Sequence, residues 1–561
     1  MRIIPKITLD EGEGEIPTPD EMVSMLLDLR DVMDPQQFLH PPHPQTITLG
    51  QLDPGLQTSC EALIQALEPL HTNEKMIVVY TDYDADGVTG GAIMWEALHI
   101  MGFKVRPYVP HRVHEGYGFS IKGIDNMKQE FDPALIISVD HGITAEEKIV
   151  YARGLGIPVV VTDHHLKPEA GPPVSALAVF HIPALSGSGV AYVVARFIYD
   201  HFKHTLSDAV KKQLDDMFQT DYLCLASIGS VADLVPLVGP TRSIVYHGLE
   251  AFAKTKRVGL LELMKQAGIA GRPVTPYEIG FVIAPRINAI GRLEHALDAL
   301  RLLCTPNLTK AQELTQKLAE TNTKRQDLVA SSIEEALVVV EKEYGQEVPP
   351  VLIVQSDSWH EGIIGLIASK LVEKYYRPTI VMTRGDGFYK ASARSIPALH
   401  MTNLLRANKS FLVDVGGHAQ AAGFTIKVEQ VDAFKKAVVE QAAKLLDADD
   451  LIPTVTPDMQ MPLSYCTIEL AHELSQMRPF GIGNPTPTFV STTTISAPRT
   501  IGREGAHLSF STPGGMGAIA FGKGKMVQEL ISQPNRTIVY QIDVNEWQGQ
   551  SRLQAKVQQI I

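Results

Sequence analysis

The chain has 561 residues, of which 45% are hydrophobic and 20% are charged, and its formal net charge is −13. This length indicates about three to five domains, and the composition is typical of a globular protein and excludes a largely disordered chain. The acidic balance argues against a generally basic nucleic-acid-binding surface. It leaves room for a local basic groove, because a site that holds divalent cations also concentrates carboxylates.

The cysteines and the N-terminus are those of a cytoplasmic protein. The four cysteines lie far apart and form no CxxC pair, which excludes a zinc ribbon and a disulfide scaffold. The N-terminal sequence MRIIPKITLDEGEGEIP has no apolar segment typical of a signal peptide, and no later apolar run approaches the roughly 20 residues needed to cross a bilayer. We therefore expect a cytoplasmic location and no membrane partner.

The first half of the chain predicts an α/β unit. Residues 1–45, rich in proline and acidic residues, are expected to form an extended arm that packs on another part of the molecule or stays mobile. In residues 46–265, three β-branched runs alternate with helix-like stretches, and the part from 205 onward is predicted to be helical. The runs are MIVVYTDYDADG, ALIISVDHGIT and IPVVVTDHH. Strands this apolar are expected to be buried in a parallel sheet, which binds its ligands just past the carboxyl ends of the strands.

The second half predicts a helical linker, another α/β unit and a β domain. Residues 266–345 end in a long charged helix, LTKAQELTQKLAETNTKRQDLVASSIEEALVVVEKEY, which is expected to link two lobes. Residues 346–450 contain IIGLIASKLVEKYY as a helix and TIVMTR as a strand. Residues 451–561 contain turn signals and alternating segments such as TPTFVSTTTIS, HLSFST and RTIVYQIDV, which predict a small all-β barrel or sandwich.

Acidic and histidine side chains follow each predicted strand of the first α/β unit, and one more aspartate lies in GSVADLVPL. They are Asp82, Asp84, Asp86, Asp140, Asp163, His164, His165 and Asp233. Oxygen and nitrogen ligands of this kind suit Mn²⁺ or Mg²⁺, and a carboxylate that bridges two ions holds them about 3.5 to 4 Å apart for in-line attack on phosphorus. A DxD motif alone is more often a turn or a helix cap, but four such segments in this order are hard to explain as independent caps.

The motif order DYDADG, SVDHG, TDHH and SVAD resembles the four motifs of the DHH phosphoesterases. Further segments resemble the bacterial RecJ exonucleases along nearly the whole chain: YVPHRVHEGYG, FVIAPRINAIGR, SDSWHEGIIGLIASKL, ASARSI, GGHAQAAGF and RPFGIGNPTP. The resemblance implies a catalytic DHH domain at 46–265, a DHH-associated domain at 346–450 and an OB-like domain at 451–561. It also implies a 5′→3′ exonuclease that releases mononucleotides from single-stranded DNA, in DNA repair and recombination.

The same resemblance implies a site with two Mn²⁺ or Mg²⁺ ions, in which Asp140 bridges the ions and a solvent-derived hydroxide attacks. The implied ligands are Asp84, Asp86, Asp140, His164 and Asp233. Asp82 and His165 are expected to be catalytic as outer or alternate ligands, because such groups orient a ligating histidine or a water. Asp163 is expected to shape the turn.

The resemblance also implies residues that face the DNA, namely Arg112, Ser392, Arg394 and His418, and we expect the first three to bind the terminal 5′-phosphate. The alternative for Arg394 is an ion pair with an acidic neighbour across the domain interface. Arg286, Asn288 and Arg292 could line the same groove, or belong to a charged loop that caps a helix. A single-strand-binding protein and a helicase are the expected protein partners of a monomer.

Two segments depart from the family pattern. After TDHH the sequence LKPEAGPPVSALAVFHIPALSGSGVAY is shortened and lacks an Asn-Pro pair, and VPLVGPTR lacks the usual acidic and Asn pair before its arginine. Neither change affects a proposed ligand. Two other functions stay open: a phosphoesterase for short oligoribonucleotides or a nucleotide phosphate, which the β tail disfavours, and a catalytically silent replication factor, which the complete ligand motifs disfavour.

Overall fold

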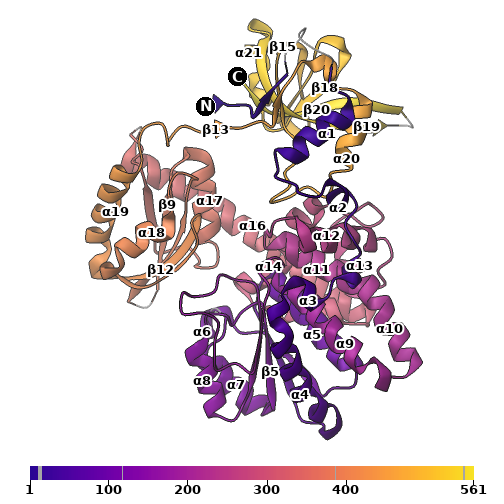
Figure 1. Ribbon diagram of the computed structural model, residues 1–561. Coiled ribbons are helices and arrows are strands. Elements are labelled where there is room, and N and C mark those ends of the chain that lie inside the picture. The colour runs from indigo at the N-terminus through magenta and orange to yellow at the C-terminus, as the bar shows by residue number, and fades with distance from the viewer. Residues whose placement is uncertain (10–15, 117, 346, 386, 548–549) are drawn as a thin grey trace. The chain divides into compact units, whose positions relative to one another are not determined.

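The computed structural model describes residues 1–9, 16–116, 118–345, 347–385, 387–547 and 550–561 (Figure 1). The chain divides into two compact units. The larger unit comprises Ile4–Gly291, His295–Leu318 and Thr456–Ile561, and the smaller unit comprises Met1–Ile3, Arg292–Glu294 and Ala319–Val455.

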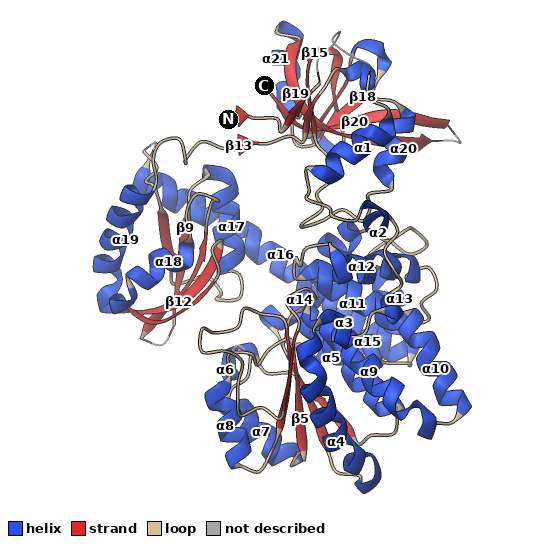
Figure 2. Cartoon of the chain, in the orientation of Figure 1, coloured by secondary structure: helices blue, strands red, loops and turns tan. Residues whose placement is uncertain are grey.

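The larger unit contains a parallel sheet of five strands in the order β4-β3-β5-β6-β7. The strands are β3 (Ile77–Thr81), β4 (Val105–Tyr108), β5 (Leu135–Val139), β6 (Val159–Asp163) and β7 (Ala178–His181). Every residue of β3, β5 and β6 is buried, because helices cover both faces (Figure 2). One face packs against α4 (Gln57–Asn73), α5 (Ala85–Ile100) and α9 (Gly187–Phe202), and the other against α7 (Ile121–Phe131) and α8 (Glu146–Gly154). The predicted parallel sheet is confirmed.

Helices follow the sheet, as predicted. They are α10 (Asp208–Gln219), α11 (Asp221–Ala232), α12 (Gly239–Ala251), α13 (Val258–Gln266), the π-helix η4 (Glu278–Ile283), α14 (Ala284–Leu293), α15 (Leu297–Cys304) and α16 (Leu308–Tyr344). The segment APRINAIGR lies in α14, so the alternative that it is a charged loop is wrong. The long predicted helix is α16, which begins in the larger unit and continues into the smaller one.

The smaller unit is a second α/β domain with the sheet order β11-β12-β10-β9-β8. Its elements are β8 (Leu352–Ser356), α17 (Ile364–Tyr375), β9 (Thr379–Arg384), β10 (Phe388–Arg394), α18 (Met401–Ala407), β11 (Leu412–Gly417), β12 (Ala421–Lys427) and α19 (Val431–Leu445). Helices α18 and α19 pack on one face of the sheet, and α17 with the end of α16 packs on the other. Both elements predicted for this region, the helix and the strand, are present as α17 and β9.

The C-terminal residues form an eight-stranded sheet in the order β16-β17-β18-β20-β19-β15-β14-β2. Its elements are β14 (Met459–Gln460), α20 (Ile468–Ser475), β15 (Phe489–Thr494), β16 (Ser496–Ile501), β17 (His507–Ser511), β18 (Gly517–Ala520), α21 (Val527–Ser532), β19 (Asn535–Trp547) and β20 (Gln550–Ile560). The predicted β domain is therefore present, with two added helices and one strand from the N-terminus.

The N-terminal residues do not form the predicted extended arm. Strand β2 (Ile7–Thr8) pairs with β14, and helix α1 (Pro19–Asp28) begins at a capping box between Thr18 and Glu21. The apolar side of α1 is buried in the core of the C-terminal β domain. The expected extended conformation is wrong, because the proline-rich and acidic composition concealed the helical spacing of MVSMLL. The packing on another part of the molecule, which was one of the two expectations for the arm, is present. Among the described residues, no helix combines the length and the apolar character that a membrane span requires.

A buried arginine joins the helices of the larger unit to the C-terminal β domain. Arg242 of α12 donates hydrogen bonds to the backbone carbonyls of Phe38, Met477, Arg478 and Pro479, and its guanidinium lies 3.9 Å from the ring centre of Phe38. Four carbonyls and an aromatic face offset the cost of burying this charge. The altered segment VPLVGPTR therefore keeps the arginine that holds RPFGIGNPTP in place.

Candidate metal centre

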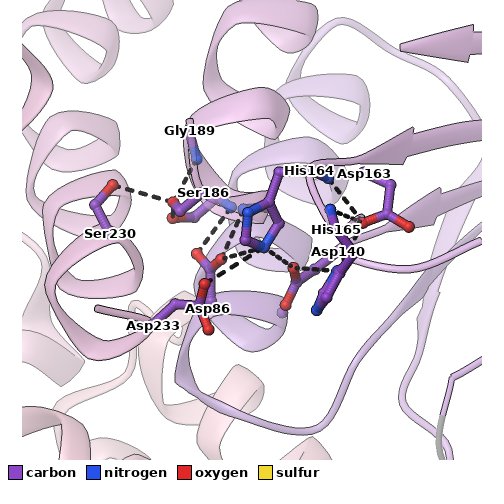
Figure 3. A network of polar contacts seen from close by, with 12 residues as sticks. Asp86, Asp140, Asp163, His164, His165, Ser186, Gly189, Ser230 and Asp233 are labelled. Atoms are coloured by element: carbon purple, nitrogen blue, oxygen red, sulfur yellow. Dashed lines mark hydrogen bonds and ion pairs between the residues drawn. The ribbon is translucent and has the colours of Figure 1, made fainter. Parts of the chain in front are cut away.

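The five predicted ligands lie together where the strands of the parallel sheet end. Figure 3 shows four of them, Asp86, Asp140, His164 and Asp233. His164 Nε2, just past β6, lies 3.2 Å from Asp140 Oδ1, 3.4 Å from Asp233 Oδ2 and 3.9 Å from Asp86 Oδ2. Three groups of ligand atoms each fall within 4.8 Å of one another. They are Asp86, His164 and Asp233; Asp82, Asp84 and Asp140; and Asp140, His164 and His165. Asp140 and His164 each belong to two groups, and Asp140 is the one carboxylate of these groups that does so. Its role as a bridge between two ions stays a prediction.

The first turn of α9 holds the Asp86 carboxylate. The backbone amides of Gly187 and Ser188 donate to Asp86 Oδ2 at 2.6 Å and Oδ1 at 2.9 Å. A Cβ at Gly187 would lie 2.3 Å from Asp140 Oδ1, and one at Gly229 would lie 2.1 Å from Asp86 Oδ1. Glycine is therefore required where α9 and α11 approach the cluster. These residues were not predicted from the sequence, although SGSG at the start of an apolar helix was an available signal.

Serine hydroxyls form a hydrogen-bonded network next to Asp86 (Figure 3). Ser186 caps α9 by accepting from the Gly189 amide at 3.2 Å, and its hydroxyl lies 3.0 Å from those of Ser188 and Ser230. All three serines are buried. The network links the start of α9, whose amides hold Asp86, to α11, the helix that ends at Asp233.

Asp84 is both a helix cap and a member of the cluster. Its Oδ1 accepts from the amides of Asp86 at 3.1 Å and Gly87 at 3.0 Å, which caps the N-terminus of α5. Asn288 Oδ1 of α14 accepts from the Ala85 amide at 2.7 Å. Asn288 is thus placed against the loop that carries the aspartates, where it fixes their backbone.

The cluster contains more negative groups than its surroundings balance. Burial raises the pKa of Asp82 and of Asp233 to about 8, and the neighbouring carboxylates add to this effect. Burial also raises the pKa of Asp140 well above its ordinary value and lowers that of His164, which favours the neutral imidazole. Asp82 Oδ2, Asp140 Oδ1 and His164 Nε2 are buried without a hydrogen-bond partner among the described residues. Unsatisfied oxygen and nitrogen atoms of this kind fit divalent cations such as Mn²⁺ or Mg²⁺.

His165 and Asp163 form a hydrogen-bonded pair beside the cluster. His165 Nδ1 lies 2.8 Å from Asp163 Oδ1, which also accepts from the amide of His164 at 2.7 Å, and Asp163 Oδ2 accepts from the Ile143 amide at 2.9 Å. Burial lowers the pKa of His165, but the bond to Asp163 and the nearby carboxylates raise it to about 9. Asp163 therefore holds the turn and orients a histidine, in keeping with the role expected for it.

The arginines expected to face the DNA have different surroundings. The Arg112 guanidinium lies 4.9 Å from the ring centre of Tyr83. Arg286 donates to the Val282 carbonyl at 2.7 Å and to Gln266 at 3.3 Å, so it also stabilises its own helical neighbourhood. Arg292, which belongs to the smaller unit, donates to the Gly362 carbonyl at 2.9 Å. The DNA contacts of these arginines stay a prediction.

In the smaller unit, Ser392 and Arg394 lie on the same side of β10, and Arg394 Nη1 donates to Ser392 Oγ at 3.1 Å. A Cβ at Gly365, in the first turn of α17, would lie 3.0 Å from each of these two side chains. Within the smaller unit as described, Arg394 has no carboxylate partner, and burial alone lowers its pKa. His418 is exposed in the turn between β11 and β12, where its amide donates to the Ala421 carbonyl at 2.7 Å.

Comparisons with known proteins agree with this arrangement. Three family models match: the N-terminal domain of the DHH family at residues 76–226, the DHHA1 domain at 349–444 and the RecJ OB domain at 457–559. The predicted catalytic, DHH-associated and OB-like domains are therefore confirmed as domain types.

Relatives of known function and solved structures indicate the same family. The single-stranded-DNA-specific exonuclease RecJ of Bacillus subtilis is 32% identical over 90% of this chain, which spans 63% of that relative. The Haemophilus influenzae RecJ is 31% identical, with 90% of each chain covered. The crystal structure of Thermus thermophilus RecJ in complex with Mn²⁺ is 27% identical in sequence and has a TM-score of 0.81. The alignment covers 100% of this chain and 80% of the Thermus chain. The Mg²⁺ complex of the same protein has a TM-score of 0.75. The chain belongs to the RecJ family of DHH proteins.

Proposed function

We propose that this chain is a metal-dependent exonuclease that hydrolyses single-stranded DNA from its 5′ end and releases 5′-mononucleotides. The observation that carries the proposal is the cluster of carboxylates around His164. In this cluster Asp82, Asp140 and His164 each have a buried side-chain atom without a hydrogen-bond partner among the described residues. Its membership of the RecJ family supports the substrate, because the curated relatives are single-stranded-DNA-specific exonucleases.

Two Mn²⁺ or Mg²⁺ ions are the proposed cofactors, held by Asp84, Asp86, Asp140, His164 and Asp233. When bound, such ions stabilise negative charge on a phosphate and make a water molecule acidic enough to act as a nucleophile. The chain's own groups prepare the site. The α9 amides fix Asp86, the buried serines fix α9 against α11, and Asp163 fixes the turn of His164 and His165. Asp82 and His165 border the ligands and complete the proposed catalytic set.

An assay that compares 5′-labelled and 3′-labelled single strands in Mn²⁺ tests the reaction and its polarity together. Immediate release of a labelled mononucleotide from the 5′-labelled strand, with gradual shortening of the 3′-labelled strand, is the expected result. The reverse pattern would contradict the polarity. Cleavage confined to the shortest substrates in a length series would favour the oligoribonucleotide or nucleotide phosphoesterase, and no cleavage at all would favour a silent binding factor.

Removing the metal is expected to make folding stability depend on pH. In the metal-free protein the pKa of Asp82 and Asp233 is about 8, against 3.8 for an ordinary aspartate. Between these values the folded state binds more protons than the unfolded state, so its stability falls as pH rises through this range. Differential scanning fluorimetry in EDTA should show a Tm that decreases from about pH 6.5 to about pH 8, because below this range the lowered pKa of His164 has the opposite effect. Mn²⁺ should raise the Tm most at the alkaline end, and a Tm independent of pH in EDTA would contradict this electrostatic account.

The C-terminal β domain is the proposed single-strand-binding module. Residues 456–561 contain eight Lys or Arg residues and seven Asp or Glu residues, whereas the whole chain contains 50 Lys or Arg and 63 Asp or Glu. This domain therefore lacks the excess of acidic residues that the whole chain has. One face is hollowed into a groove of about 1290 Å³ that contains Arg499 and Arg552 among serine, threonine and asparagine side chains. Arginines and hydroxyls suit a DNA backbone.

Substituting both groove arginines, Arg499→Ala with Arg552→Ala, is expected to weaken binding of long strands about tenfold and to spare hydrolysis of dinucleotides. Each lost phosphate contact lowers the salt dependence of single-strand binding by about 0.7, so the double variant should lose about 1.4 from the slope. Fluorescence anisotropy at several salt concentrations measures both quantities. Arg503→Ala is the matched control, because Arg503 is almost fully exposed and lies outside the groove lining. Equal effects of the double variant and the control would contradict the groove.

Further assignments complete the proposal. We propose a role in DNA repair and recombination, and domain boundaries at 46–265, 266–345, 346–450 and 451–561. A helicase that exposes single strands and a single-strand-binding protein that covers them are the proposed protein partners of a monomer. The four cysteines are free thiols, which supports the cytoplasm as the proposed location.

We keep His418, Arg286 and Arg292 as proposed DNA contacts. Asn288 is proposed to fix the loop that carries the aspartates.

A further inference from the structure

Helix α11, which delivers Asp233 to the cluster, ends in an unusual way. The Val235 amide donates to the Ser230 carbonyl at 3.2 Å, and the Leu234 amide donates to the Val231 carbonyl at 3.3 Å, which is the hydrogen-bond pattern of a Schellman motif. The residue after the C-cap in this motif has a left-handed backbone and is usually glycine, since a Cβ is unfavourable there. Here that residue is Leu234, with a φ of +61°.

The leucine side chain brings no packing that would offset this strain. Leu234 is 65% exposed, whereas the next residue, Val235, is 6% exposed and belongs to the core. Leucine is one of the residue types that rarely adopt a left-handed backbone, and an apolar side chain in water adds nothing to folding. Non-glycine residues that persist in strained conformations cluster at functional sites.

The position of Leu234 connects it to the metal centre. It directly follows Asp233, whose Oδ2 lies 3.4 Å from His164 Nε2. The Asp233 side chain is 32% exposed, whereas those of Asp86 and Asp140 are 1% and 3% exposed. Asp233 therefore stands at the side of the cluster that is open to solvent, where a phosphate has to enter. Neighbouring Cα atoms are about 3.8 Å apart, so the leucine is within reach of the nucleotide attached to that phosphate.

We propose that Leu234 is a substrate-contact residue that packs against the deoxyribose or base of the nucleotide next to the scissile phosphate. This inference rests on the proposed nuclease function. An apolar side chain contacts any sugar or base without reading its sequence, which suits an enzyme that degrades a strand one nucleotide after another. This contact also explains why position 234 holds leucine, although glycine would make the folded state more stable there.

The variant Leu234→Gly separates this role from a structural one. Glycine relieves the left-handed strain, so the Tm should equal or exceed that of the wild type, and the Tm increase caused by Mn²⁺ should be unchanged. The value of kcat/KM on a 5′-phosphorylated single strand should nevertheless fall about tenfold, as expected when an apolar contact of about 1.4 kcal/mol is lost. Leu234→Met should keep most of the activity, whereas Leu234→Asn, which tolerates the backbone but is polar, should behave like the glycine variant.

Glu74→Gly is the matched control, because Glu74 also has a left-handed backbone, with a φ of +55°, at the exposed C-terminal end of α4. It should gain stability without a change in activity. A Leu234→Gly protein that keeps the wild-type kcat/KM would overturn the proposal, and so would one with a lowered Tm, which would show a packing role. A wild-type protein without Mn²⁺-dependent cleavage would instead contradict the proposed function itself.

Discussion

Asp140→Asn is expected to slow hydrolysis of single strands by about a thousandfold or more while single-strand binding is retained. Asp140 takes part in two of the three groups of converging ligand atoms, so its carboxylate is the one that we propose two ions to share. An amide has the same shape without the charge. Losing a charge that organises two cations costs several kcal/mol, and each 1.36 kcal/mol is a factor of ten in rate. Turnover of a 5′-labelled strand in Mn²⁺ and fluorescence anisotropy of a long strand measure the two properties.

Asparagine tests Asp140 more cleanly than alanine, because Asp140 has a φ of +67° and asparagine tolerates a left-handed backbone. Asp132→Asn is the matched control. Asp132 has a φ of +43° at the exposed end of α7, outside the cluster, so its variant should keep full activity. An Asp140→Asn enzyme with more than about a tenth of wild-type turnover would rule out the bridging role. Parallel loss of strand affinity would show that the ions, and not the groove, hold the strand.

The parallel sheet and the cluster of acidic and histidine residues at its edge were predictable from the sequence because two regularities coincide there. The runs of β3, β5 and β6 are mostly apolar and every residue in them is buried, and acidic or histidine residues stand at or just past the end of each strand. Strands β4 and β7 escaped prediction because they are four residues long, and β4 contains an arginine and a proline. Short edge strands of this kind carry too little periodicity to be distinguished from loops.

The groups that hold the ligands were not predictable from local sequence. Gly187 is 101 residues from Asp86, and Asn288 is 203 residues from Ala85, so only the folded chain brings these pairs together. The segment around Gly187 was recognised as a departure from the family pattern, but its function was not. The structure shows that this altered segment supplies the helix N-terminus that holds Asp86.

We propose that the smaller unit contributes the group that gives the proposed reaction its polarity. Metal ions hydrolyse any phosphodiester that reaches them, so an enzyme that starts at a 5′ end needs a group that binds the terminal phosphate. Ser392 Oγ and the Arg394 guanidinium lie side by side on β10, next to Gly365 in the first turn of α17. A hydroxyl, a guanidinium and a helix N-terminus together suit a phosphate, and a doubly charged terminal phosphate more than a diester.

Arg394→Ala is therefore expected to lower kcat/KM on 5′-phosphorylated strands by about 10- to 150-fold, because hydrogen bonds to charged groups contribute about 1.5 to 3 kcal/mol. Strands with a 5′-hydroxyl should be affected much less, so the wild-type preference for a 5′-phosphate should shrink toward one. Arg384→Ala, at the end of the neighbouring strand β9, is the matched control, since Arg384 is exposed and pairs with Asp357. If a folded Arg394→Ala enzyme loses activity equally on both substrates, Arg394 supports the domain and does not read the terminal phosphate.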